Sequence, residues 1–123
     1  MTFFQISLIL ISHFFADFIF QNDRMALGKS KSLKWLSLHV LVYTGVLFLG
    51  TGILFFREPY MWICFGVVNG MLHWVVDFFT SRLNARLWNY ESKHWFFVGI
   101  GFDQLLHGLC LFGSVELLRF YNV

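Results

Sequence analysis

The stretch YMWICFGVVNGMLHWVVDFFT, residues 60–80, decides the fold class of this chain. It is almost entirely apolar, and about 20 such residues are needed for a helix to cross the hydrocarbon core of a bilayer. Three further stretches have the same character, at residues 2–20, 33–56 and 95–120. The sequence therefore predicts an all-α, polytopic membrane protein. We expect a bundle of four transmembrane helices in which residues 1–123 form one integral membrane domain.

The composition excludes several other classes of protein. Of the 123 residues, 58% are apolar and 13% are charged, whereas about 25% of residues are charged in a usual soluble domain. A soluble domain of this size would expose much of that apolar surface to water. An ordinary soluble domain, a disordered chain and a nucleic-acid-binding protein are therefore excluded. Cys64 and Cys110 lie in apolar stretches and form neither a disulfide framework nor a CxxC metal motif.

The basic residues predict the orientation of the spans. The loops after the first and third spans carry Arg24, Lys29, Lys31, Lys34, Arg82, Arg86 and Lys93. The opposite side carries only Arg57 and Arg119. By the positive-inside rule, both basic loops face the cytoplasm and both termini lie outside it. The loop cations are also suited to contact anionic lipids.

Ionisable residues occur inside all four predicted spans. They are His13, Asp17, His39, His73, Asp77, Asp103 and His107. Three of the spans use i,i+4 spacing, which places both side chains on one helix face. At 1.5 Å of rise per residue, all seven lie within roughly 14 Å of one another along the membrane normal. Because ionisable groups in hydrocarbon are costly, we expect one functional site in the cytoplasmic half of the membrane.

Three carboxylates and four imidazoles form a ligand set that suits Zn, Fe or Mn, and helix bundles build such sites from inward-facing residues. Three Asp charges are balanced by two divalent ions and one hydroxide, so the site is predicted to hold one or two ions. The expected metal ligands are His13, Asp17, His73, Asp77, Asp103 and His107. His39 is expected to be a ligand or an acid–base catalyst, and Gln21 and Gln104 to contact the substrate or support the ligands. Asp23 and His94 are expected to border the entrance.

Two further patterns concern packing. Gly66 and Gly70 form a GxxxG motif on the helix face of His73 and Asp77, which predicts the close approach of another helix or of a second copy of the chain. The pattern HxxxDF occurs at residues 13–18 and again at residues 73–78, each time before a basic loop. This repeat suggests two duplicated helical hairpins.

These residues favour a metal-dependent membrane enzyme. We expect a hydrolase that acts on a lipid or lipid-linked phosphate at the cytoplasmic leaflet, where a metal ion lowers the pKa of water. An oxidative di-iron enzyme would use the same ligands. Other classes remain open: a small proton- or metal-ion transporter or channel subunit, and a structural membrane factor with a polar locking core. Beyond Glu116 and Arg119, the outer half has few ionisable groups, which favours a one-sided site over a conduit.

Three strings of this sequence resemble those of a known family. They are HxxxDFxxQ from His13 to Gln21, NGxxHxxxD from Asn69 to Asp77, and FDQxxH from Phe102 to His107. They are similar to the motifs of a family of small bacterial and phage membrane proteins that is catalogued as a domain of unknown function. The resemblance covers nearly the whole chain. It implies a protein of the bacterial inner, or cytoplasmic, membrane and brings no established activity.

Overall fold

The computed structural model describes residues 1–121, which contain helices and no strand. In chain order the elements are α1 (Phe3–Phe14), the π-helix η1 (Phe15–Ile19), α2 (Asp23–Gly28), α3 (Leu33–Thr51), the 3₁₀-helix η2 (Gly52–Leu54), α4 (Pro59–Asn89) and α5 (Lys93–Phe120). The predicted all-α class is confirmed.

Local sequence explains where several helices begin. Thr2 and Gln5 form a capping box at the start of α1: the Thr2 hydroxyl accepts from Gln5 N at 3.3 Å, and Gln5 Oε1 accepts from Thr2 N at 2.9 Å. Asn22 caps α2 by accepting from Met25 N at 2.9 Å. Pro59 begins α4, where a missing N–H costs no intrahelical hydrogen bond.

Among residues 1–121, three helical segments are long and apolar enough to cross a membrane: Leu33–Leu54, Pro59–Asn89 and Lys93–Phe120. The segment Phe3–Ile19 is also apolar but shorter. Large apolar side chains point outward from these helices, for example Leu41, Leu49 and Leu109, which are 70%, 86% and 62% exposed. An outer surface of this kind is compatible with a membrane location.

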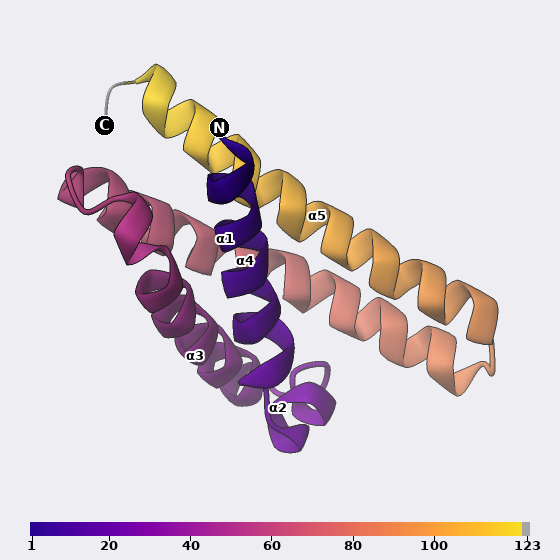
Figure 1. Ribbon diagram of the computed structural model, residues 1–123. Helices are drawn as coiled ribbons and strands as arrows, with labels where there is room; N and C mark the ends of the chain where they lie inside the picture. The colour runs from indigo at the N-terminus through magenta and orange to yellow at the C-terminus, as the bar shows by residue number, and fades with distance from the viewer. Residues whose placement is uncertain (122–123) are drawn as a thin grey trace.

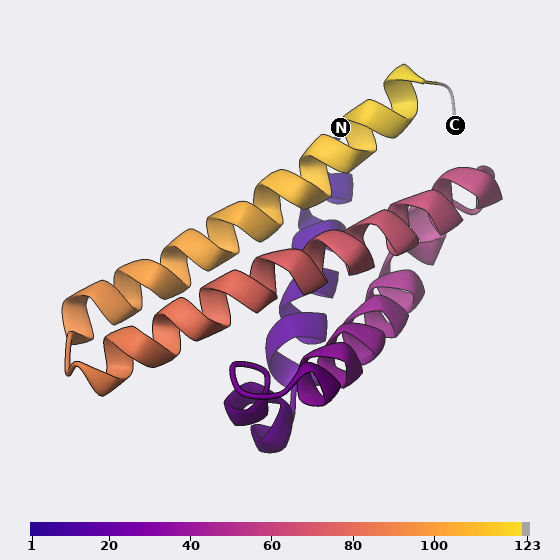
Figure 2. The ribbon, with the colours of Figure 1, turned by 180° about the vertical axis from the view of Figure 1, so that it is seen from behind.

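The long helices α4 and α5 run antiparallel and side by side, as both views show (Figures 1 and 2). Helix α3 packs on α4, and α1 packs on α3. The N-terminus, the end of α5 and the turn before α4 lie toward one end of the molecule, whereas α2 and the α4–α5 turn lie toward the other (Figure 1). The segments that carry most of the basic residues therefore share one end.

Helix α4 is longer than the span that the sequence predicted. The expected polar loop after residue 80 is helical through Arg82 and Arg86 to Asn89. The chain reverses at residues 90–92, where Glu91 has a φ of 54°. Residues 81–89 contain neither Gly nor Pro, and Arg, Leu and Ala favour helix, so the charges alone did not end it. The α4–α5 hairpin consequently extends beyond α1 and α3 (Figure 2).

Along each of the four main helices, the inward-facing residues change from apolar to polar. Ile9, Leu47, Phe65, Leu111 and Val115 belong to an apolar core. On each helix the same inward face then continues into polar residues: Ile9 to His13 and Asp17 on α1–η1, Leu47 to Tyr43 and His39 on α3, Phe65 to Asn69, His73 and Asp77 on α4, and Leu111 to His107 and Asp103 on α5. Residues four apart share a helix face, so four separate stripes meet as one polar layer.

The glycine motif of α4 serves packing inside the chain. Gly66 and Gly70 are buried, and a Cβ atom on them would collide with the Phe48 ring and the Thr44 hydroxyl of α3. The predicted close approach of a helix is confirmed, but that helix is α3 of the same chain. Helix α3 covers this face of α4, and a homo-oligomer of the chain stays a prediction.

Candidate metal centre

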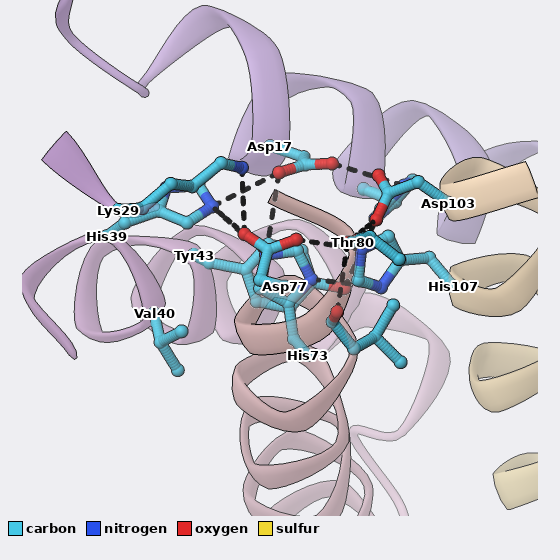
Figure 3. A network of polar contacts seen from close by, with 12 residues as sticks. Asp17, Lys29, His39, Val40, Tyr43, His73, Asp77, Thr80, Asp103 and His107 are labelled. Carbon is cyan, nitrogen blue, oxygen red and sulfur yellow. Dashed lines mark hydrogen bonds and ion pairs between the residues drawn. The ribbon is translucent and has the colours of Figure 1, made fainter. Parts of the chain in front are cut away.

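Six of the seven ionisable residues of the predicted spans lie together in one buried cluster (Figure 3), and the seventh, His13, adjoins it with Nε2 3.9 Å from Asp17 Oδ2. None of them is more than 9% exposed. Short polar contacts link Asp17 to His39, His39 to His73, His73 to His107, and His107 to both Asp77 and Asp103. The predicted convergence of four helix faces is therefore present in the structure.

Four ligand atoms of this cluster, one each from Asp17, His39, His73 and Asp77, lie within 4.8 Å of one another and are named the tetrahedral group, after the four-ligand geometry of zinc. His39 Nε2 is 3.0 Å from His73 Nε2, 3.1 Å from Asp17 Oδ1 and 3.3 Å from Asp77 Oδ2. His73 Nε2 is 3.4 Å from Asp17 Oδ1 and 3.5 Å from Asp77 Oδ2. Tetrahedral ligands at the usual zinc distances are roughly 3.3–3.6 Å apart. The separations from the two imidazole nitrogens are within about 0.3 Å of this range, so the four atoms are close enough together to surround one ion.

Hydrogen-bond arithmetic also favours a cation between these four atoms. An ionised carboxylate only accepts hydrogen bonds, and each imidazole Nε2 carries at most one proton. His39 Nε2 faces three acceptors within 3.3 Å, and one proton cannot bond to all of them. A divalent ion would bind all four atoms at once. Two imidazole nitrogens and two carboxylate oxygens are ligands that Zn, Fe and Mn accept, so the residues fit such an ion.

A second group of ligand atoms adjoins the first and comprises Asp17, Asp103 and His107. His107 Nε2 lies 3.4 Å from Asp103 Oδ1. The Gln104 amide donates to Asp17 Oδ2 at 3.1 Å and to Asp103 Oδ2 at 3.0 Å. The Asp17 carboxylate thus has one oxygen in the tetrahedral group and the other turned toward Asp103, as a carboxylate that links two neighbouring sites would.

Lys29 is a site residue that the sequence analysis missed. Its ammonium donates to Asp77 Oδ2 at 2.8 Å, and its side chain is only 15% exposed. Burial lowers the pKa of Lys29, but the charges of Asp77 and Asp17 outweigh burial and hold this pKa above its usual value. With neutral imidazoles, three carboxylates and one ammonium leave a charge of −2, which one divalent ion cancels. Three buried Asp residues need a nearby cation, and this need could have identified Lys29. The sequence instead suggested only that the loop lysines set the orientation and contact anionic lipids.

Two other missed residues hold the ligands in place. The Tyr43 ring stacks on His73 with centroids 3.7 Å apart, and its hydroxyl lies 3.2 Å from His13 Nδ1. The Thr80 hydroxyl donates to Asp103 at 2.5 Å. Contacts of this kind fix the orientation of metal ligands. Helical spacing could have identified both, since Tyr43 is four residues after His39 and Thr80 is three after Asp77.

The remaining predicted residues differ in their positions. Gln104 lies within the cluster, whereas His13 lies outside both ligand groups and pairs with Gln104 Oε1 at 3.0 Å. Gln21 lines a cavity beside the cluster. Asp23 and His94 are exposed, and neither residue makes a polar side-chain contact with the cluster.

Asp17 lies on an unusual turn of helix. Phe20 N donates to Phe15 O at 2.9 Å, which is the i→i+5 hydrogen bond of a π-helix. Short π-helical turns within α-helices are frequent at functional sites. The wider turn belongs to the same segment that supplies the carboxylate shared by the two ligand groups.

A cavity of about 490 Å³ lies between α2 and the outer part of the α4–α5 hairpin. Its polar lining includes Asp17, Gln21, Lys29, Lys31, Ser81, Asn84, Asp103 and Gln104, and its apolar lining includes Phe18, Leu27, Trp88, Phe96 and Ile100. Residues of the cluster thus form part of its wall. The cavity gives the cluster a route to ligands from outside the bundle.

Together the fold and the cluster define a small, all-helical protein of membrane-like composition whose buried His/Asp centre has ligand geometry for a metal ion. The chain belongs to the family described as "Protein of unknown function (DUF3307)", which matches residues 5–118. The resemblance identified from the sequence motifs is confirmed. No curated protein and no solved structure matches the chain.

Proposed function

We propose that this protein is a metal-dependent integral membrane hydrolase that acts on a lipid or lipid-linked phosphate at the cytoplasmic leaflet. The observation that carries the proposal is the tetrahedral group of Asp17, His39, His73 and Asp77, in which each imidazole Nε2 lies 3.0–3.5 Å from the other three atoms, next to a cavity of about 490 Å³. Hydrolysis of a phosphate ester needs an electrophile for the phosphoryl group and a base for water. The cluster offers residues that would hold a metal ion as the electrophile, and carboxylates that would act as the base.

When bound, a divalent ion would polarise a phosphoryl oxygen and lower the pKa of water. Asp17, His39, His73 and Asp77 would hold that ion. Asp103 lines the cavity and is placed to take a proton beside it, while His107 Nε2, 3.2 Å from Asp77 and 3.4 Å from Asp103, holds these carboxylates in position. In this assignment His39 is a ligand rather than a free acid–base group. Gln104 and Gln21 line the cavity and are assigned to substrate contacts.

The proposal includes a topology of four spans. The segment Phe3–Ile19 would be about 25 Å long as a helix, close to the shortest length that crosses a bilayer. Both basic ends, at α2 and the α4–α5 turn, would face the cytoplasm. Tags at either terminus should then be accessible from outside, and a tag between Gly28 and Ser32 should not be. A cytoplasmic C-terminus would contradict this topology.

The decisive experiment measures metal content and lipid hydrolysis in the same samples of purified full-length protein, prepared with metal and without chelator. We expect close to one or two ions per chain and hydrolysis of short-chain phosphatidic acid or phosphatidylglycerol. His73→Gln should lose both. His94→Gln is the matched control, because His94 is exposed and outside the cluster, and it should lose neither. A wild-type protein without bound metal would contradict the proposal.

A further inference from the structure

The lining of the cavity between α2 and the outer α4–α5 hairpin combines two kinds of side chain. It includes Asp17 and Asp103 of the candidate centre together with Lys29 and Lys31. It also includes large apolar side chains, of which Leu27 and Trp88 are 73% and 58% exposed. A molecule with a charged head and an apolar chain requires both kinds of contact.

Three buried polar atoms belong to residues of the same wall. Within residues 1–121, the buried side-chain atoms without a hydrogen-bond partner are Gln21 Oε1, His39 Nδ1, Ser81 Oγ and Asn84 Oδ1. All of these residues except His39 line the cavity. A buried acceptor without a donor is unfavourable, so such atoms point to a ligand that supplies donors. The Gln21 oxygen is an acceptor that a hydroxyl group would satisfy, whereas Asn84 Oδ1 lies against Gly99 of α5.

The charged residues around the cavity indicate the charge of the head group that it binds. With the ion of the proposed function, the three carboxylates of the centre and Lys29 carry no net charge, so Lys31 leaves the cavity with one positive charge. The cavity then favours an anion. Its volume of about 490 Å³ accommodates roughly 16 groups the size of a water molecule. This is enough for a phosphate and a small polyol but not for two acyl chains, which would leave past Phe18, a cavity residue of the apolar segment Phe3–Ile19 that is 43% exposed.

We propose that this cavity binds the head group of an anionic phospholipid that carries free hydroxyl groups, with its chains leaving laterally past Phe18. The proposal rests on the proposed function, because it names the substrate class of the same centre. The lipid, rather than a free phosphate ester, is chosen because the cavity lining includes large apolar side chains that are also exposed on the outer surface, Phe18 and Leu27 among them.

Binding of dioctanoyl phosphatidylglycerol to the full-length protein in detergent tests this inference, with dioctanoyl phosphatidylcholine and water-soluble glycerol phosphate as comparison ligands. Ala85 lines the cavity without belonging to the metal centre, so Ala85→Phe fills the cavity. We expect the affinity for phosphatidylglycerol to fall about tenfold or more in this variant. Val75→Phe is the matched control, because Val75 lies on the exposed side of α4, and it should bind as the wild type does.

The lysines provide an independent pair of variants. Lys31→Gln removes a cavity cation and should weaken binding several-fold, whereas Lys34→Gln, an exposed lysine outside the cavity, should not. Equal affinity for phosphatidylcholine or for glycerol phosphate would overturn the inference, and so would unchanged binding in Ala85→Phe. Metal content measured on the same samples separates the two proposals. Full metal content without selective lipid binding refutes only the lipid, and absent metal in the wild type refutes the hydrolase.

Discussion

The pattern HxxxDF occurs twice in this chain, and the two copies reach different positions in the same site. On α4, His73 and Asp77 both contribute an atom to the tetrahedral group. On α1 and η1, only Asp17 does so, and His13 turns to Tyr43 and Gln104 instead. Identical spacing therefore did not give identical ligand sets.

The difference follows from the packing around each copy. Helix α4 packs against both α3 and α5, so the His73 ring is stacked between Tyr43 and His107, at 3.7 and 4.1 Å between centroids. Helix α1 packs mainly on α3 and passes into a π-helical turn at Phe15. Spacing fixes which side chains share a helix face, and the neighbouring helices decide which atoms meet.

The largest effect is expected on metal affinity, when the histidines of the two copies are replaced one at a time. His73→Gln should weaken metal binding by more than about 100-fold, because it removes a ligand atom. His13→Gln should weaken it only about tenfold, because it removes a side chain that orients Gln104. Competition with a fluorescent chelator measures both affinities. Equal losses would mean that the two copies ligate the metal equally.

The aspartates should behave alike where the histidines differ. Bound metal stabilises the fold by mass action, by about 2.7 kcal/mol when free metal is 100-fold above its dissociation constant. A chelator should therefore lower the melting temperature of the wild type. Asp17→Asn and Asp77→Asn should each abolish that response, since both carboxylates belong to the tetrahedral group. If the Asp17→Asn protein still responds fully, the first copy of the pattern stands apart from the centre.

The two copies also differ in their contact with Lys29, because its ammonium group donates a hydrogen bond to Asp77 of the second copy. Lys29→Gln should lower the free energy of unfolding of the metal-free protein by about 2 kcal/mol, because it removes the cation bound to a buried carboxylate. With metal bound the loss should be smaller, so the chelator response should increase. Thermal unfolding with and without chelator measures this, and Lys34→Gln serves as the exposed control. A chelator response identical to the wild type would exclude competition between Lys29 and the metal for Asp77.

The smallest expected effect concerns the packing beside the first copy. A Cβ atom on Gly50 would collide with Ser12, the residue before His13, whereas a Cβ on Gly108 meets nothing within 4 Å. Gly50→Ala should therefore lower the free energy of unfolding by about 1 kcal/mol through overpacking. Gly108→Ala should cause no loss. Thermal unfolding in detergent compares the two, and equal stability would show that α1 adjusts freely against α3.

The repeat suggests that a helical hairpin was duplicated, and this duplication stays a prediction. After the first copy the helix ends at Ile19 and the chain forms the short α2, whereas after the second copy α4 continues to Asn89. The first copy is thereby followed by the segment that supplies Lys29. The second is followed by the hairpin wall of the cavity.

The sequence by itself determined the fold class and most of the members of the centre. Long apolar stretches can satisfy their backbone only as helices in an apolar environment, and i,i+4 spacing places polar residues on one face. These local rules were sufficient to select Asp17, His39, His73, Asp77, Asp103 and His107 as neighbours. They did not reveal that α4 runs to Asn89, because charged residues are good helix formers and do not end a helix.

Only the tertiary structure decided how those residues are divided among roles. That His39 joins the tetrahedral group and His13 does not, that Lys29 reaches Asp77, and that Gly66 and Gly70 face α3 all depend on contacts between segments far apart in the chain. Such contacts follow from how the helices pack and cross, and helical periodicity alone does not determine that geometry. The physical reason is that a sequence pattern fixes directions around one helix axis, whereas a metal centre needs atoms from several helices within about 3.5 Å of one another.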